Sequence, residues 1–109
     1  MMNQVQLIGR LEKDPELRTL GSGRQVASFP LQVPRKTVMV GSKSNHDTFL
    51  IEAFGQTAHY TMEEIVRGRL IAVTGHLATK PMKNSDGVEF EAVYVAANTV
   101  CLLDRPTNA

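Results

Sequence analysis

The stretch "DTFLIEAFGQTAHYTMEEIVRGRLIAVTG", residues 47–75, changes its hydrophobic period twice and thereby decides the fold. In its first eight residues apolar side chains alternate as in a β-strand, with Phe49, Ile51 and Ala53 on one face. The other face carries Thr48, Leu50, Glu52 and Phe54. Because a domain of this size buries one sheet face in its core, we expect Phe49 to be buried and Phe54 to stand on the outer face.

The period becomes helical after this strand. Ala58, Met62, Ile65 and Val66 recur at helical spacing, and Gly68 stands where a helix C-cap is expected. These positions predict a short amphipathic helix over 56–68. Strand alternation resumes over 69–80, so the helix connects two strands.

Three further segments outside this stretch read as strands, over 3–11, 24–33 and 88–103. Gly9 and Gly75 predict bends or bulges, and Pro30 predicts an edge or bulged position because proline cannot donate to a ladder. Residues 34–46 suggest a hairpin extension or loop, and the Asp-Gly within 81–87 is a strong turn signal. This order predicts an all-β protein, a five-stranded Greek-key barrel of the oligonucleotide/oligosaccharide-binding (OB) fold with one short helix between strands three and four.

Size and composition bound the possible classes of protein. The chain has 109 residues, 42% hydrophobic and 21% charged, with a formal net charge of +1, which fits one globular domain. No apolar run approaches the length of about eighteen residues that a membrane helix needs, and the N-terminus lacks the pattern of a signal peptide. We therefore expect a soluble, cytoplasmic protein without membrane contact. Cys101, the single cysteine, excludes an intramolecular disulfide and is expected to be a buried thiol.

The sequence carries no pattern typical of an active site. His46, His59 and His76 match no zinc spacing, and the neighbours Glu63 and Glu64 point apart on a helix. "GSGRQV" at 21–26 precedes a strand and lacks the third glycine of a dinucleotide site. We expect no enzymatic activity, no cofactor and no metal.

Several motifs in order resemble the bacterial single-stranded DNA-binding protein family. They are "NQVQLIGRLEKDPELR", "GSGRQVASFPL", "AFG" and "VRGRLIAVTGHLAT", and the resemblance runs from about residue 3 to 102. It implies an OB-fold domain over 1–103 that coats single-stranded DNA without reading its sequence, in replication, recombination or repair. The remaining residues, 104–109, read as a short C-terminal extension that lacks the acidic tail of the family.

The resemblance assigns stacking aromatics, and this sequence departs from most of them. Phe54 keeps the aromatic residue at the end of the third strand, whereas the family's tryptophans fall at Thr48, near Thr37 or Val38, and at Met82. Each stacked base contributes about 1–3 kcal/mol, so fewer rings predict weaker binding. Glu52, on the face of Phe54, is expected to repel phosphates and weaken it further.

Basic residues complete the predicted interface. Arg10 belongs to the opening motif, Arg18 follows Asp-Pro-Glu and Arg67 matches a basic residue at the helix end. The other basic residues lie on the two hairpins expected to flank a strand of DNA. The predicted nucleic-acid-binding residues are Arg10, Arg18, Arg35, Lys36, Lys43, Thr48, Phe54, Arg67, Lys80, Met82 and Lys83. The alternatives are that the charges are solvated surface groups and that Phe54 is buried in the barrel or in a subunit interface.

Two functions stay open from the sequence. The first is sequence-independent binding of single-stranded DNA; the second is that of a primosomal-type OB-fold adaptor, which acts mainly through protein contacts and binds DNA weakly. The expected partners are single-stranded DNA, further copies of the chain, and replication or primosome proteins. A homo-oligomer, tetramer before dimer, is expected because Leu50, Leu70, Ile71 and the apolar first strand offer more hydrophobic surface than one barrel needs. We expect it to form by pairing of first strands and by sheet packing.

Overall fold

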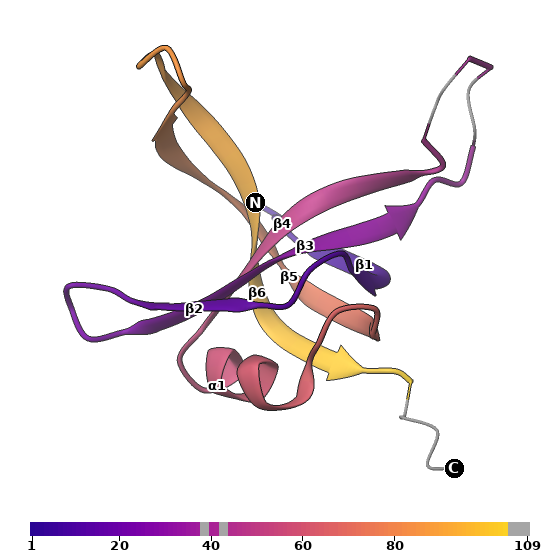
Figure 1. The fold of residues 1–109 in the computed structure, drawn as a ribbon, viewed down its shortest axis with the longest axis horizontal. Helices are drawn as coiled ribbons and strands as arrows, with labels where there is room; N and C mark the ends of the chain where they lie inside the picture. Colours follow the sequence, from indigo (N-terminus) through magenta and orange to yellow (C-terminus); the bar gives the residue numbers. More distant parts are fainter. Residues whose placement is uncertain (38–39, 42–43, 105–109) are drawn as a thin grey trace.

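The structure is a computed structural model in which residues 1–37, 40–41 and 44–104 are described. Strands make up most of it, and one helix lies between the fourth and fifth strands (Figure 1). The elements are β1 (Val5–Leu11), β2 (Glu16–Thr19), β3 (Gln25–Pro34), β4 (His46–Phe54), α1 (Gly55–Glu64), β5 (Leu70–Lys83) and β6 (Glu89–Leu102).

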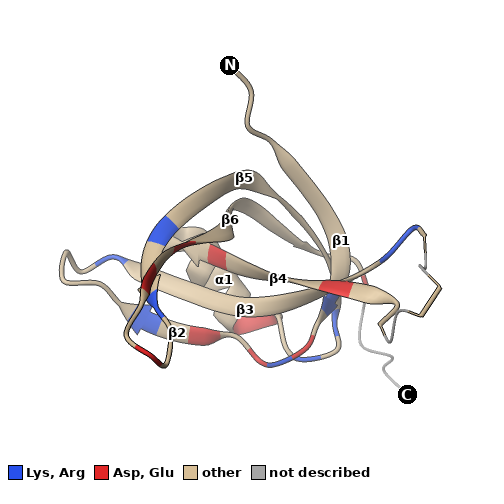
Figure 2. Ribbon diagram, turned by 90° about the horizontal axis from the view of Figure 1, so that it is seen from above, with Lys and Arg blue, Asp and Glu red and all other residues tan. Residues whose placement is uncertain are grey.

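The strands form one mixed six-stranded sheet that returns on itself. Its order is β1-β5-β6-β4-β3-β2, and an additional β1–β3 pairing closes a ring through five strands. The β4–β6 pairing is parallel, whereas the other pairings are antiparallel. Figure 2 looks toward the opening of this ring, with α1 behind it. The helix therefore covers one end of the space that the curled sheet encloses.

Two elements differ from the sequence-based expectation. A sixth strand, β2, occupies Glu16–Thr19, a segment that lies outside the five predicted strands. It forms because these residues pair with Gln25–Ser28 of β3. The helix ends at Glu64 and not at Gly68: Ile65 adopts an extended conformation (φ −107°, ψ 124°). Ile65 is fully buried in the core, so its packing ends the helix early and carries the chain toward β5.

The predicted special positions lie where strands crowd or change partner. A Cβ on Gly9 would lie 2.1 Å from the Gln32 carbonyl oxygen, so glycine lets β1 pass close to β3; its pairing with β5 continues without a bulge. The β5–β6 register shifts between Thr74 and Gly75, which confirms the predicted irregularity. Pro30 lies between the stretches of β3 that pair with β2 and β1, a local edge, as predicted.

The core confirms most of the predicted alternation of buried residues. At three residues the observed burial differs from the expected one. Ile51 and Ala53 are fully buried, but Phe49, predicted to be buried with them, is 38% exposed. The pairing of β4 with β6 covers only Ile51–Ala53, so Phe49 lies beyond the part of β4 that β6 flanks. Ile71, expected at an interface, is fully buried, and Cys101, expected to be buried, is exposed. The core cluster comprises Leu11, Phe29, Leu31, Ile51, Ala53, Ile65, Ile71, Val73, Val95, Ala97 and Val100.

Two long hairpins project beyond the ring. In Figure 1 the β5–β6 hairpin extends to the upper left and the β3–β4 hairpin to the upper right. The first ends in a turn over 84–88, in which the Asn84 side chain accepts hydrogen bonds from the backbone N–H groups of Asp86 and Val88. Gly87 has a φ of 79°, which explains the Asp-Gly signal. Within the described residues, no helix has the length and apolar character needed to cross a membrane.

Candidate nucleic-acid interface

An open pocket lies on the outer face of the sheet, where β4 meets α1. It has a volume of about 420 Å³, and the aromatic rings of Phe54 and Tyr94 line it together with His76 and Asn98. Phe54 is half-buried and lies on the outer face, as its position in the alternation predicts. The Arg24 guanidinium lies over the Phe54 ring, 4.8 Å from its centroid. The pocket therefore combines two aromatic rings with a cation.

A buried carboxylate holds two cations beside this pocket. Glu52, two residues before Phe54, is only 3% exposed. Its Oε2 accepts hydrogen bonds from Arg18 Nη2 at 3.0 Å and from Lys80 Nζ at 2.5 Å. These partners come from β2 and β5, on either side of β4 in the curled sheet. The expectation that Glu52 repels phosphates is therefore corrected: its charge is compensated by two neighbouring cations.

Lys80 connects the ion cluster to the second ring. Its Nζ lies 5.0 Å from the centroid of the Tyr94 ring, a distance at which a cation is attracted to the face of an aromatic ring. Aromatic rings and cations thus form one continuous surface, which we call the β4–β6 cleft. The β4–β6 cleft comprises Arg18, Arg24, Glu52, Phe54, Lys80 and Tyr94.

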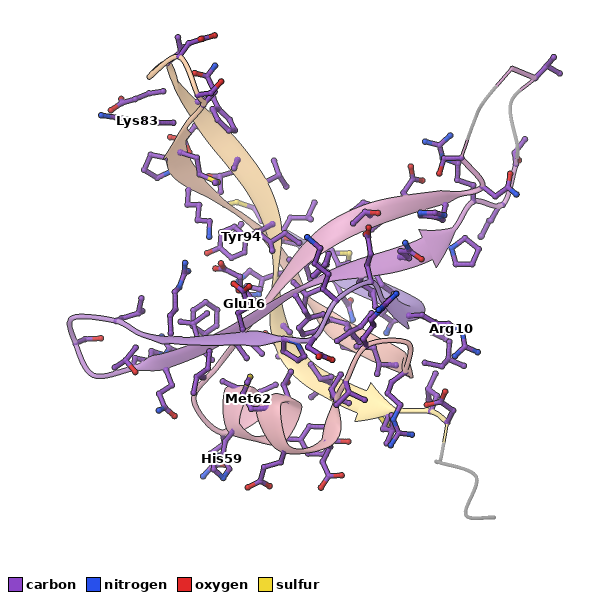
Figure 3. The ribbon with its side chains drawn as sticks, viewed as in Figure 1. Arg10, Glu16, His59, Met62, Lys83 and Tyr94 are labelled. Atoms are coloured by element: carbon purple, nitrogen blue, oxygen red, sulfur yellow. The ribbon has the colours of Figure 1, made fainter. Side chains whose placement is uncertain are left out.

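Two predicted site residues lie away from the β4–β6 cleft. Arg10 donates to the Gly68 carbonyl and forms an ion pair with Asp104 at 3.3 Å. Figure 3 shows Arg10 beside the C-terminal end of β6, whereas Tyr94 lies over the middle of the sheet. Arg67 follows α1, and its backbone N–H donates to Asp14. The structure does not bring these two arginines together with Phe54.

The β3–β4 hairpin carries another group of predicted residues. Arg35 forms an ion pair with Asp47 at 2.8 Å. The hydrogen bond from Arg35 lowers the pKa of Asp47 from its ordinary value, and the same bond raises the pKa of Arg35. Lys36 and Thr48 are exposed, and the Thr48 hydroxyl lies 3.5 Å from a Glu12 carboxylate oxygen. Lys43 and Val38 lie outside the described residues.

The remaining two predicted residues lie on opposite faces of the β5–β6 hairpin. Met82 is 41% exposed and stands on the face of Lys80, two residues away. Lys83 projects to the other face, where it approaches Glu89 of β6 at 4.0 Å. The hairpin therefore offers Lys80 and Met82, but not Lys83, to the β4–β6 cleft.

Sequence reasoning missed three features of this surface. The sequence predicts Arg24, Phe90 and Tyr94 only as strand residues, with no part in the interface. Alternation within "FEAVYVA", residues 90–96, places both rings on one face, and that signal was available. The pairing of β6 with β5, which brings Lys80 onto the same face, could not be read from the alternation.

The histidines form no metal centre in the described residues, where no group of three His, Cys, Asp or Glu side chains is placed to hold an ion. His59 Nε2 lies 2.8 Å from a Glu63 carboxylate oxygen on the exposed face of α1. In Figure 3 His59 lies on the helix, far from Tyr94. His76 lines the pocket beside Phe54.

The curled sheet carries aromatic rings and cations on its outer face, and this combination is typical of a binding protein. The chain belongs to the single-strand binding protein family, whose family model matches residues 2–103. Similar proteins include single-stranded DNA-binding protein B of Bacillus subtilis (strain 168), 35% identical over 95% of this chain and 92% of that protein. The single-stranded DNA-binding protein of Staphylococcus aureus (strain MRSA252) is 35% identical over 100% of this chain and 69% of its own. The single-stranded DNA-binding protein of Clostridium tetani (strain Massachusetts / E88) is 36% identical over 94% of this chain and 71% of that protein.

Family membership confirms the sequence-based resemblance and the class of function. The chain is a single-stranded DNA-binding protein of DNA metabolism and not an enzyme. The family also implies the OB-fold, with which the ring of five strands and the helix between β4 and β5 agree.

Proposed function

We propose that the β4–β6 cleft is the surface on which this chain binds single-stranded DNA without reading its sequence. The observation that carries the proposal is the half-buried Phe54 ring, which lines an open pocket beside compensated cations. An aromatic ring stacks on any base, and cations neutralise phosphates whatever the sequence. A duplex keeps its bases stacked on one another, so the Phe54 ring discriminates in favour of single strands.

The contributions of the predicted residues follow from their positions. Phe54 stacks a base, and Arg18 and Lys80 bind phosphates. Met82 extends the apolar surface, while Arg35, Lys36 and Thr48 of the β3–β4 hairpin guide the strand beyond the β4–β6 cleft. For Lys43, which lies outside the described residues, the proposed phosphate contact rests on the sequence alone. The other three cations lie away from the β4–β6 cleft and therefore attract the DNA only at long range. They are Arg10, Arg67 and Lys83.

The domain as a whole is proposed to act on DNA in the cytoplasm, at the nucleoid. Residues 1–103 constitute the DNA-binding domain, a Greek-key OB barrel made of β1, β3, β4, β5 and β6. In this description β2 is an added strand on β3 that brings Arg18 to Glu52.

Titration of the protein with labelled oligo-dT and with duplex of equal length, by fluorescence anisotropy, tests this function. We expect binding to the single strand to be tighter at every salt concentration. Affinity should fall steeply with salt, with a logarithmic slope of about −0.7 for each phosphate neutralised. Equal affinity for both forms would contradict the proposal and favour the adaptor function.

We further propose that the chain forms a homo-oligomer, tetramer before dimer, through its first strand. Among the described residues, Val5–Ile8 pair with β5 alone, so the other edge of this part of β1 is open to a second copy. Ile8 is 56% exposed and lines a groove of about 330 Å³ together with the half-buried Leu70. An open edge next to apolar surface favours association of identical chains.

Light scattering tests the assembly. We expect a mass of about four times the 12.0 kDa of one chain. An Ile8→Glu variant should have a lower mass, because the carboxylate would be desolvated at the interface. Val93→Glu, at an exposed position on the β5–β6 hairpin, is the matched control and should keep the wild-type mass. A wild-type monomer whose mass does not change with concentration would refute the assembly.

A further inference from the structure

Two aromatic side chains of β6 share the sheet face that forms the β4–β6 cleft. Phe90 and Tyr94 are four residues apart, so both project to the same side of the strand. Across the hairpin, Phe90 faces Met82 and Tyr94 faces Ala78 of β5. Phe90 is 47% exposed, whereas Tyr94 is half-buried at the pocket of Phe54. Aromatic surface therefore continues from the pocket outward along the hairpin.

A cation lies between these two rings. Lys80 faces Ala92, the residue midway between Phe90 and Tyr94, and its Nζ lies over the Tyr94 ring. Going out along this face, the hairpin presents a ring, a cation and a second ring. Alternating aromatic and basic groups are what a single-stranded nucleic acid requires, because its bases stack while its phosphates need counter-charges.

The opposite face of the same hairpin has a different chemistry. It carries Leu77 and Val93, both exposed, together with Glu89 and Glu91. The Lys83 ammonium group on this face lies beside Glu89. Two carboxylates would repel a phosphate backbone, and this face of the strands has no aromatic ring over residues 77–83 and 89–93. The contrast between the faces favours nucleic acid, and not a protein partner, as the occupant of the Phe90 face.

We propose that Phe90 and Tyr94 are nucleobase-stacking residues that extend the DNA-binding surface from Phe54 along the β5–β6 hairpin. This inference rests on the proposed function of the β4–β6 cleft. Residues four apart on a strand lie roughly 13 Å apart, so the two rings stack on different nucleotides. Lys80 binds the phosphates between them, and the hairpin guides the strand away from the pocket.

A tryptophan reporter tests the position of Phe90 directly. The natural chain has no tryptophan, so Phe90→Trp introduces the only indole. We expect oligo-dT to quench its fluorescence, because a stacked base contacts the ring. Val93→Trp, on the opposite face of the same strand, should not be quenched. Equal quenching of both, or quenching of neither by an oligo-dT that still binds, would overturn the proposal.

Affinity measurements separate this inference from the proposed function. Phe90→Ala should weaken oligo-dT binding about 5- to 150-fold, the equivalent of one stacked base, and leave the salt slope unchanged because no phosphate contact is lost. Tyr94→Ala should weaken it similarly and Tyr94→Phe should not. Val93→Ala is the matched control and should bind like the wild type. If wild type, Phe90→Ala and Tyr94→Ala bind equally well, this inference fails while the proposed function stands; if wild type does not bind, both fail.

A subunit interface is the other occupant that these experiments can reveal. Light scattering of Phe90→Ala should give the wild-type mass. A lower mass together with weaker binding would show that the ring packs against another copy of the chain, and would overturn the proposal.

Discussion

The Phe54→Ala variant is expected to lose about 1–3 kcal/mol of oligo-dT binding free energy, the contribution of one stacked base. Its stability should change little, because the ring lies on the outer face of β4 and lines an open pocket, with only the Arg24 guanidinium over it. Titrations of the variant against oligo-dT, with thermal melts of the free protein, measure the two effects separately.

Phe29→Ala is the control for a ring that belongs to the core. Phe29 is 1% exposed and lies within the core cluster, so its removal should cost about 3–5 kcal/mol of unfolding free energy. Phe49, which alternation places in the core, is unsuitable as this control because it is 38% exposed.

The two rings therefore predict opposite patterns. Phe54→Ala should bind oligo-dT weakly and keep a melting temperature near that of the wild type. Phe29→Ala should have a clearly lower melting temperature. If Phe54→Ala melts as early as Phe29→Ala, Phe54 serves packing, and the DNA-binding role of the β4–β6 cleft would be contradicted in favour of the adaptor function.

Alternation and turn signals predicted the elements because each depends on neighbouring residues. The strand over residues 47–54, the helix after it and the two long C-terminal strands were found in this way. β2 was missed because its four residues are all exposed and carry no alternation. The exposure of Phe49 was missed for another reason. It depends on where β6 stops pairing with β4, and no local sequence pattern indicates that position.

The candidate site was predicted as a set of residue types and not as an arrangement. Phe54 could be placed on the outer face because the period of a strand fixes its side. The pairing of Glu52 with Arg18 and Lys80 joins three strands that are far apart in sequence, so the sequence alone suggested repulsion where the structure has compensation. Likewise, Lys80 and Lys83 were both expected to flank the DNA, although a spacing of three residues on a strand sends them to opposite faces.

The Glu52 cluster yields the second large effect. Replacing Arg18 and Lys80 together by methionine keeps much of the apolar stems but removes both cations from a carboxylate whose side chain is 4% exposed. An uncompensated buried charge costs about 3–5 kcal/mol, so the double variant should be strongly destabilised in thermal or urea melts.

A triple variant separates stability from binding. Adding Glu52→Met removes the buried charge, and an apolar replacement of a whole ion cluster is often neutral or stabilising. The triple variant should therefore recover most of the lost stability. It should still bind oligo-dT weakly, with a salt slope flatter by about 1.4, because two phosphate-neutralising cations at about 0.7 each are gone.

The outcome depends on which role the two cations have. If they only compensate Glu52, the triple variant should recover oligo-dT affinity together with stability, and Arg18 and Lys80 would no longer belong to the DNA-binding surface. If they bind phosphates, as proposed, affinity and salt slope stay reduced although the fold is restored. Because both variants lack the same two cations and differ only at Glu52, a stability difference between them reports the buried carboxylate alone. If the triple variant regains stability but still has reduced oligo-dT affinity, the role of Glu52 is to position Arg18 and Lys80, and the role of these two cations is to bind DNA.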